Sequence, residues 1–388
     1  MKDFNLVINR RNTNSLKWDV GANELPMWVA DMDVKTANCV TQAIVTKAQS
    51  GVFGYQIVPD EWYQSIINWW GVRHEFAIRK EWLCFCTGVV PAITSSVKRL
   101  TNVGDNVVVL TPVYDIFYHS IENTGRHVLE CPLTYKDGSY DVDFDDLKAK
   151  LSDPLSTMLI LCNPHNPVGK VWSKDVLKRI GNLCSKHGVT VFSDEIHCDL
   201  TAPNVNYTPF ASVSETCNNV SVTAISASKA FNLAGLQSAA VFCSNEQLRA
   251  KVVRGLNSDE LAEPNAFAIE ATIAAFSEEG GKWLDGLREH IASNKKIVED
   301  YLLGNLPTVK AITQDATYLM WLDCSAITND SQTLADFIRA QTGLFVSAGT
   351  KYRGNGNYFL RLNVACPEST LKDGLNRLQQ GITKFANS

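Results

Sequence analysis

Long apolar runs are missing from this 388-residue chain, and so is a large excess of charge of either sign. No stretch is long and uncharged enough to cross a bilayer. The first residues, MKDFNLVINRRNTNSLKWD, contain no apolar core of the length that a signal peptide needs. The formal net charge of -5 gives no general attraction to nucleic acid or to an anionic membrane. We therefore expect a cytoplasmic protein that acts on small molecules.

A regular cysteine framework is also missing. Eleven cysteines, an odd number, are scattered through apolar runs, and in a reducing compartment such residues act as small buried hydrophobes. Cys84 and Cys86 form a C-x-C pair, but no second pair of cysteines or histidines stands at the spacing of metal ligands. The spacing argues against a zinc site.

Repeats and long linkers are absent as well, while the 45% of hydrophobic residues can fill a large core, so we expect two lobes. Continuous apolar runs, which are typical of strands covered on both faces, lie at 106–110, 157–162, 189–194, 220–226 and 239–243. Between them, residues 173–188 predict a helix that Ser173 caps and Gly188 ends. This alternation predicts an α/β fold with a mostly parallel sheet.

The hydrophobic pattern of the sequence changes after about residue 284. A long polar helix leads into an apolar run, a helix around 331–342, a second apolar run and a final helix. We predict a large domain at 46–284 and a smaller α+β domain at 285–388, which the N-terminal segment 1–45 joins. Ligands usually bind in a cleft between such lobes.

Polar residues stand just after several predicted strands, and ligands of open α/β sheets bind beyond the carboxyl ends of the strands. These residues are Tyr114, Asn166, Asp194, His197 and Lys229. In addition, Gly88 lies in a turn that opens a helix, whose free N–H groups can bind phosphate. We therefore expect one site at this edge of the sheet.

Lys229 stands among small, hydroxylated and apolar residues in ISASKAFNLAGLQS. A lysine at a strand end can simply extend its amine to water. Burial would instead lower its pKa and make the amine a nucleophile that forms Schiff bases. The other residues also have structural explanations, as turns, helix caps or core side chains. Together they match pyridoxal phosphate, which needs a lysine, a carboxylate, a donor to its ring oxygen, an aromatic lid and a phosphate cup.

The chain resembles fold-type I pyridoxal-phosphate enzymes of the class I/II aminotransferase superfamily, and among them the MalY/PatB group of carbon–sulfur β-lyases. The resemblance runs nearly end to end, through PMWVADMD, GVFGYQ, TPVYDIF, NPHNPVGKVW, SDEIHCDL, SASKAFNLAGLQ and YFLRLNVACP. It implies an aspartate-aminotransferase-like fold with a seven-stranded sheet. It also implies β-elimination of L-cystathionine, L-cysteine or related S-conjugates to pyruvate, ammonia and a thiol, as in methionine biosynthesis.

The resemblance also implies residue roles. Lys229 would form the Schiff base and move the substrate Cα proton, assisted by Asp194 on the pyridine nitrogen and by Tyr114 stacked on the ring. Asn166 would donate to the ring oxygen, beside His197. The residues implied to hold the phosphate are Gly88, Val89, Val90, Ser226 and Ser228.

Two further residues are implied to bind across the active site. Arg361 would clamp the substrate α-carboxylate as a bidentate pair. Tyr55 would reach the cofactor phosphate and substrate of a neighbouring subunit, which implies a homodimer with shared sites.

Two residues depart from the aminotransferase pattern, of which His197 favours the β-lyase group, and a third residue departs from the β-lyases. His197 stands where aminotransferases carry a tyrosine, and DEIH is usual for the β-lyases. Gln237 stands where many aminotransferases place an arginine against the phosphate, which predicts weaker cofactor binding. Asp115 follows the stacking tyrosine where β-lyases often have an aromatic or small residue. An aminotransferase stays the alternative, and a regulatory role through contact with a protein partner is a third interpretation.

Overall fold

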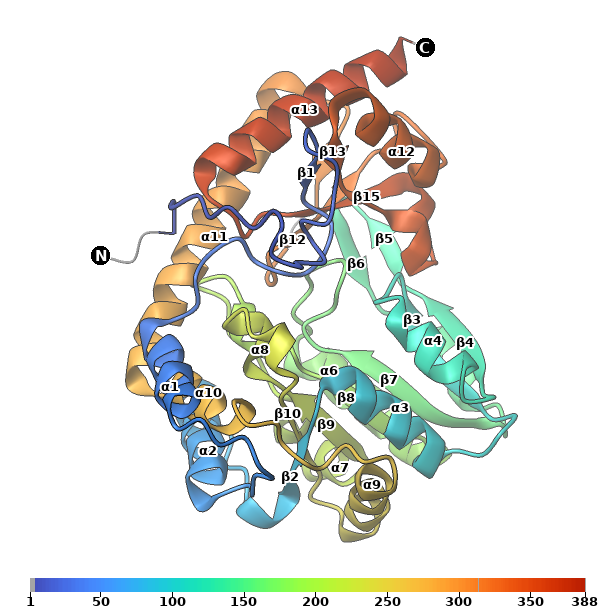
Figure 1. Ribbon diagram of the computed structural model, residues 1–388. Helices are drawn as coiled ribbons and strands as arrows, with labels where there is room; N and C mark the ends of the chain where they lie inside the picture. Colours follow the sequence, from blue (N-terminus) through green and yellow to red (C-terminus); the bar gives the residue numbers. More distant parts are fainter. Residues whose placement is uncertain (1–3, 313, 388) are drawn as a thin grey trace.

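A seven-stranded sheet forms the centre of the computed structural model, which describes residues 4–312 and 314–387 (Figure 1). The strand order is β2-β10-β9-β8-β7-β3-β4. Only β10 runs against its neighbours, and the other pairs are parallel. The strands are β2 (Leu83–Cys86), β3 (Asn106–Thr111), β4 (His127–Pro132), β7 (Ser156–Cys162), β8 (Thr190–Asp194), β9 (Ser221–Ile225) and β10 (Ala239–Phe242). The predicted α/β fold with a mostly parallel sheet is confirmed.

The central strands are continuous apolar runs because helices cover both faces of the sheet (Figure 1). Every residue of β9 and β10 is buried, and so are all residues of β3 and β8 except the first. The helices of this part of the chain are α1 (Asn38–Gln49), α2 (Asp60–Arg73), α3 (Val89–Leu100), α4 (Ile116–Glu122), α5 (Phe144–Leu151), α6 (Lys174–His187), α7 (Glu215–Asn219), α8 (Ala227–Ala230), α9 (Glu246–Ser258) and α10 (Ala268–Ala275). The five apolar runs of the sequence all correspond to strands.

Helix α6 shows how local chemistry sets the element boundaries. The Ser173 hydroxyl accepts a hydrogen bond from the backbone N–H of Val176 at the start of the helix. At the other end, Gly188 adopts φ +69°, a left-handed conformation that a glycine reaches without steric cost. Both predicted ends are confirmed.

A second sheet, of four strands in the order β11-β12-β15-β14, lies at the other end of the molecule with two covering helices (Figure 1). The long helix α11 (Glu278–Asn305) runs along both parts. The remaining elements here are β11 (Lys310–Ala311), β12 (Leu319–Asp323), α12 (Ser331–Thr342), β13 (Leu344–Phe345), β14 (Ser347–Ala348), β15 (Phe359–Asn363) and α13 (Glu368–Ala386). A two-stranded hairpin, β5 (Thr134–Lys136) with β6 (Ser139–Asp141), follows β4 in the chain and contacts the small sheet, where the Tyr135 hydroxyl donates to Asp323.

The N-terminal segment lies beside the small sheet. Strand β1 (Leu25–Pro26) pairs in parallel with β13, and the backbone N–H of Met27 donates to the carbonyl of Phe345. Residues 1–3 of the predicted 1–45 segment are outside the described residues. The pairing brings residues 27–34 to the space between the two sheets, where the candidate site lies.

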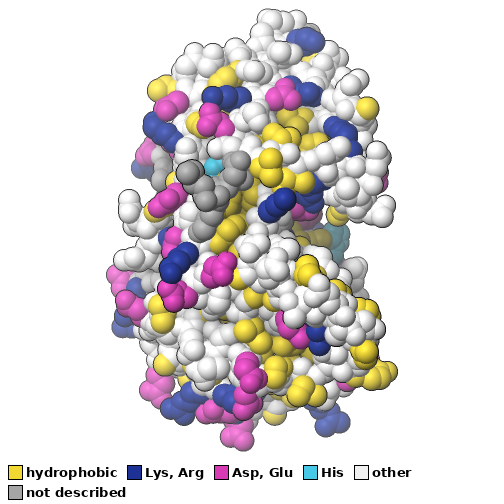
Figure 2. Space-filling view, turned by 60° about the vertical axis from the view of Figure 1, so that its left-hand side comes forward, with side chains coloured by type: hydrophobic (Ala, Val, Ile, Leu, Met, Phe, Trp, Pro, Cys, Tyr) yellow, Lys and Arg dark blue, Asp and Glu magenta, His cyan; other side chains and the backbone are white. Residues whose placement is uncertain are grey.

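On the face that Figure 2 shows, neither positive nor negative side chains of the described residues form a patch of one sign. Charges of both signs are interspersed on the face in Figure 2, with apolar side chains gathered in patches between them. None of the helices in the described part of the chain combines the length and the hydropathy that a membrane crossing requires. All eleven cysteines are free thiols.

Candidate active site

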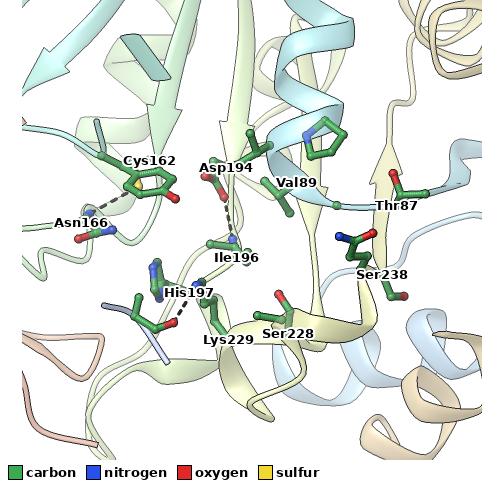
Figure 3. A pocket seen from close by; sticks show the side chains of 17 residues that line it. Thr87, Val89, Cys162, Asn166, Asp194, Ile196, His197, Ser228, Lys229 and Ser238 are labelled. Carbon is green, nitrogen blue, oxygen red and sulfur yellow. Dashed lines mark hydrogen bonds between the residues drawn. The ribbon is translucent and has the colours of Figure 1, made fainter. Parts of the chain in front are cut away.

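A cavity of about 260 Å³ opens where the strands of the large sheet end (Figure 3). Its walls come from the start of α3, the segments after β3, β7 and β8, and the short helix α8 that follows β9. The sequence-predicted residues that line it are Gly88, Val89, Val90, Tyr114, Asn166, Asp194, His197, Ser228 and Lys229. The residues that follow the strands thus line one cavity, and their roles in it stay predictions.

Lys229 extends from α8 into this cavity (Figure 3). Its Nζ donates a hydrogen bond to the carbonyl oxygen of Ala30, 2.9 Å away. Burial lowers the pKa of Lys229 to about 8, the charge of Arg361 adds to the shift, and Asp31 and Asp194 oppose it. The amine therefore lies in the cavity and not in open solvent, and its lowered pKa gives it a larger neutral fraction near physiological pH than an exposed lysine has.

Asp194 ends strand β8 and faces the cavity from the sheet side (Figure 3). One carboxylate oxygen accepts a hydrogen bond of 3.1 Å from the backbone N–H of Ile196. Burial raises the pKa of Asp194 to about 7, against the effects of that hydrogen bond and of Lys229. Few groups stabilise the ionised form of this buried carboxylate, so it fits a cationic ligand group, such as a protonated pyridine nitrogen.

Asn166 and Arg361 are bonded to each other. The Arg361 Nη1 donates to the amide oxygen of Asn166 at 3.1 Å, and Nη2 donates to the carbonyl of Trp28 at 3.1 Å. Because the amide oxygen is occupied, the amide nitrogen of Asn166 is left to donate into the cavity. Arg361 is 3% exposed, and its Nε is buried without a partner among the described residues. That unpartnered donor fits a carboxylate ligand.

Two rings complete the cavity wall. Burial lowers the pKa of His197 to about 3, with help from the charges of Lys229 and Arg361, so its imidazole is neutral. Its Nδ1 is buried without a hydrogen-bond partner among the described residues. Burial raises the pKa of Tyr114 to about 12, so its phenol keeps its proton. Both side chains therefore face the cavity as neutral groups.

The N-terminus of α3 lines the cavity and has the chemistry of an anion site. Gly88 precedes the helix with an extended backbone, and Val89 and Val90 begin it, so their N–H groups lie in its first turn. Ser226 is not among the cavity-lining residues, since its hydroxyl donates to the carbonyl of Ser238 at 2.6 Å and accepts from the N–H of Ser228 at 3.0 Å. Ser226 caps α8, and its phosphate role stays a prediction.

Tyr55 also lies outside this cavity. Its side chain is 98% exposed, and it lines an adjoining hollow with Phe53 and Phe267. Thr87 and Gln237 line both spaces, so the two are neighbours. The role of Tyr55 toward another subunit stays a prediction.

Sequence reasoning missed several residues of the cavity wall. These are Ala30, Thr87, Cys162, Ile196, Ala234 and Ser238. Thr87 stands beside the predicted glycine turn, and its hydroxyl was a signal that could have been used. Ala30 contributes a backbone carbonyl, which no side chain announces.

A second polar cluster lies away from the cavity. Among the described residues, His74, Cys198 and Asp199 are the one group placed closely enough to hold a metal ion. However, one Asp199 oxygen already accepts from Trp69 Nε1 at 2.9 Å and lies 3.0 Å from His74 Nε2. Burial also raises the pKa of the Cys198 thiol, which keeps it protonated. These contacts explain the cluster as buried structure.

The aminotransferase class I and II family model matches residues 19–378, which is most of the chain. The chain belongs to this family. It is 43% identical over 380 residues to cystathionine β-lyase PatB of Bacillus subtilis, covering 96% of this chain and 98% of PatB. It is 32% identical to protein MalY of Escherichia coli, over 98% of this chain and 99% of MalY.

A solved structure extends the likeness to a cofactor-bound protein. Cystalysin from Treponema denticola, which contains pyridoxal 5'-phosphate, matches with a TM-score of 0.95 and 33% identity over 99% of both chains. The family resemblance found in the sequence motifs is confirmed.

Proposed function

We propose that this chain is a pyridoxal-phosphate-dependent carbon–sulfur β-lyase. It would cleave L-cystathionine, L-cysteine or related S-conjugates to pyruvate, ammonia and a thiol. The observation that carries the proposal is the cavity itself: Lys229 and Asp194 face it together, in a chain 43% identical to a cystathionine β-lyase. Release of a thiol amino acid from cystathionine would place the reaction in methionine synthesis, in the cytoplasm.

The cavity residues fit pyridoxal phosphate. Asp194 would hold the pyridine nitrogen protonated, Asn166 and neutral His197 would lie at the ring oxygen, and Tyr114 would cover the ring. The α3 N-terminus and Ser228 would hold the phosphate. Bound pyridoxal phosphate supplies an electron sink for the negative charge that develops at the substrate Cα.

The protein's own residues then account for the remaining steps. Arg361 would bind the substrate α-carboxylate through its unpartnered Nε and an Nη, which fixes the Cα beside Lys229. The Lys229 amine, with its pKa near 8, would take the Cα proton as general base and, as the Cβ–S bond breaks, would give a proton to the departing thiolate so that it leaves as a thiol. Asp194 must be ionised to stabilise the charge, and a cation in the cavity would lower its raised pKa.

The exposed apolar segment before α2 supports a homodimer with shared sites. Four apolar residues there are strongly exposed: Val52 at 72%, Phe53 at 56%, Tyr55 at 98% and Ile57 at 80%. Such a patch is unusual on a monomer, and it adjoins the hollow that continues the active-site cavity. We therefore propose that a second copy covers it, which sedimentation of the loaded protein would measure.

The deciding experiment is an assay of the cofactor-loaded protein with L-cystathionine, with and without an added keto acid. Release of pyruvate and free thiol without the keto acid is the expected result. The family also contains aminotransferases, which share the cofactor contacts. Turnover that requires the keto acid, yields a new amino acid and releases no thiol would make the protein an aminotransferase instead.

A further inference from the structure

The short loop between β14 and β15 is fixed against the start of α4, close to the active site. The backbone carbonyl of Tyr352 accepts hydrogen bonds from the Tyr118 hydroxyl at 2.6 Å and from the Val113 N–H at 3.1 Å. Next to it, the Arg353 guanidinium pairs with Glu122 at 2.8 Å. Lys351 directly precedes Tyr352, so these contacts also hold Lys351 in place.

Lys351 and Asp115 face each other across this junction. The Lys351 Nζ lies 3.8 Å from the Asp115 Oδ2, which is the long end of an ion pair. Asp115 stands at the N-cap position of α4, yet its carboxylate accepts no capping hydrogen bond. In the described ranges 4–312 and 314–387, neither side chain has another ion partner. Both groups therefore keep hydrogen-bonding capacity for a ligand.

The pair lies next to residues that the proposed reaction uses. The ring of Tyr352 has the Arg361 guanidinium 4.9 Å from its centroid and the Lys351 Nζ 5.1 Å from it. On the other side, Asp115 directly follows Tyr114. The charge of Asp115 contributes to the raised pKa of Tyr114, and the charge of Arg361 adds to burial in lowering the pKa of Lys351. The pair is thus within electrostatic reach of both the carboxylate clamp and the ring cover.

We propose that Asp115 and Lys351 bind the leaving half of the thioether when that half is itself an amino acid. This inference rests on the proposed β-lyase activity. With the α-carboxylate at Arg361, the sulfur and the distal end of the substrate lie a few bonds away. A distal zwitterion carries one ammonium for Asp115 and one carboxylate for Lys351. The Asp115–Lys351 pair would then be what selects a thioether charged at both ends, such as the cystathionine of the proposed function, over one with an uncharged leaving half.

The energetics favour such an exchange of partners. A partly exposed ion pair at 3.8 Å contributes little stability, so it opens at small cost. The side chains are 23% and 35% exposed, so they can reach a ligand while lying partly out of water. Two charge-assisted hydrogen bonds to a ligand replace one loose contact, and hydrogen bonds to charged groups are the stronger kind.

The test compares two thioethers on the loaded enzyme. L-cystathionine has a charged leaving half, whereas S-ethyl-L-cysteine has an uncharged one. We expect Asp115→Asn and Lys351→Met each to lower kcat/KM for cystathionine about tenfold. For S-ethyl-L-cysteine the change should stay within about twofold. An equal loss for both thioethers, or no loss for either, would overturn the inference.

A matched control pair and a binding measurement separate this inference from the lyase assignment. Lys296→Met and Asp300→Asn remove the same charges from an exposed ion pair on α11 and should leave both thioethers unaffected. Calorimetry on the Lys229→Ala background, with free pyridoxal phosphate kept in excess, measures binding without turnover. There, Asp115→Asn should weaken binding of cystathionine about tenfold and leave S-ethyl-L-cysteine unchanged. If the wild type released pyruvate from neither thioether, the lyase proposal would fail while this binding result still decided the recognition proposal.

Discussion

Two partly buried lysines, Lys229 and Lys295, have similarly lowered pKa values but lie in different surroundings. Burial lowers the pKa of each to about 8. Lys229 faces a carboxylate, a neutral histidine and a helix N-terminus in one cavity. Lys295, on α11, donates to the Ala316 carbonyl at 3.1 Å and borders a separate cavity of about 290 Å³.

The comparison shows that a lowered pKa does not identify a catalytic lysine. Desolvation alone produces the shift, so both residues have it. What distinguishes Lys229 is the set of groups around it, each suited to a different part of one cofactor. Around Lys295 the opposing charges are Glu299, one turn along the same helix, and Asp315. We therefore expect the two lysines to differ in catalytic role but to have the same effect on the free energy of unfolding.

Removal of the Lys229 amine should abolish activity, whereas removal of the Lys295 amine should leave it nearly unchanged. This difference is the largest expected effect. Lys229→Ala should abolish the visible absorption of lysine-bound cofactor and lower turnover at least about 1,000-fold, because both the attachment point and the general base are lost. Lys295→Ala should keep the absorption band and turnover within about threefold. Absorption spectra after dialysis and pyruvate assays measure both. A band that survives dialysis in Lys229→Ala would refute its assignment.

Asp194 and Glu195, which are neighbours in the chain, extend the comparison from two lysines to two carboxylates. Asp194 faces the cavity, whereas the next residue, Glu195, accepts hydrogen bonds from Ser193, Phe210 and Tyr207. We expect Asp194→Asn to lower turnover about 100-fold in a folded protein, because an amide cannot stabilise the protonated ring. Glu195→Gln should cost about 1–3 kcal/mol of stability instead, with turnover nearly kept.

Paired thermal unfolding and pyruvate assays on both variants check this second prediction. Full turnover in Asp194→Asn would remove its assigned role. A Glu195→Gln variant as stable as the wild type would show that the hydrogen bonds of that carboxylate are not needed for the fold.

Much of this arrangement could be predicted from the sequence. The five continuous apolar runs identified the inner strands because burial on both faces leaves little room for polar residues. The edge strand β4 has exposed residues at both ends and gave no comparable signal. Strands of two residues, such as β1 and β13, are too short for any periodicity. The predicted domain boundary at 284/285 falls inside the continuous helix α11 and stays a prediction.

The residues of the candidate site likewise fall into those that the sequence predicts and those that it does not. Residues at strand ends, such as Asp194, were predictable because parallel strands end at one edge of the sheet. Arg361 comes from the small sheet, far along the chain, and only the family resemblance pointed to it. The contact of Ala30 with Lys229 depends on how the N-terminal segment folds back, and a backbone carbonyl has no sequence signature. Local patterns thus predict the cavity residues at the strand ends better than the contacts that tertiary packing adds.

The last prediction concerns stability, where the two lysines should behave alike. Each has a pKa of about 8 in the folded cofactor-free protein and an ordinary value of 10.5. Between these values the unfolded chain binds more protons, so burial of the amines destabilises the fold below about pH 8, and this penalty fades as the pH rises toward 10. Lys229→Met and Lys295→Met should therefore each raise the melting temperature by about 3 °C at pH 7.

Scanning calorimetry of the cofactor-free protein at pH 7 and pH 10 measures this difference. The gain over the wild type should largely disappear at pH 10, where the amines are neutral in the folded protein and most of the penalty is gone. The comparison with the wild type at each pH matters because the raised thiol and phenol pKa values, such as those of Cys84 and Tyr114, shift stability in the opposite sense at high pH. A gain that is equal at both pH values would come from packing and not from the charge. If only Lys229→Met showed the pH-dependent gain, the two lysines would differ in burial as well as in chemistry.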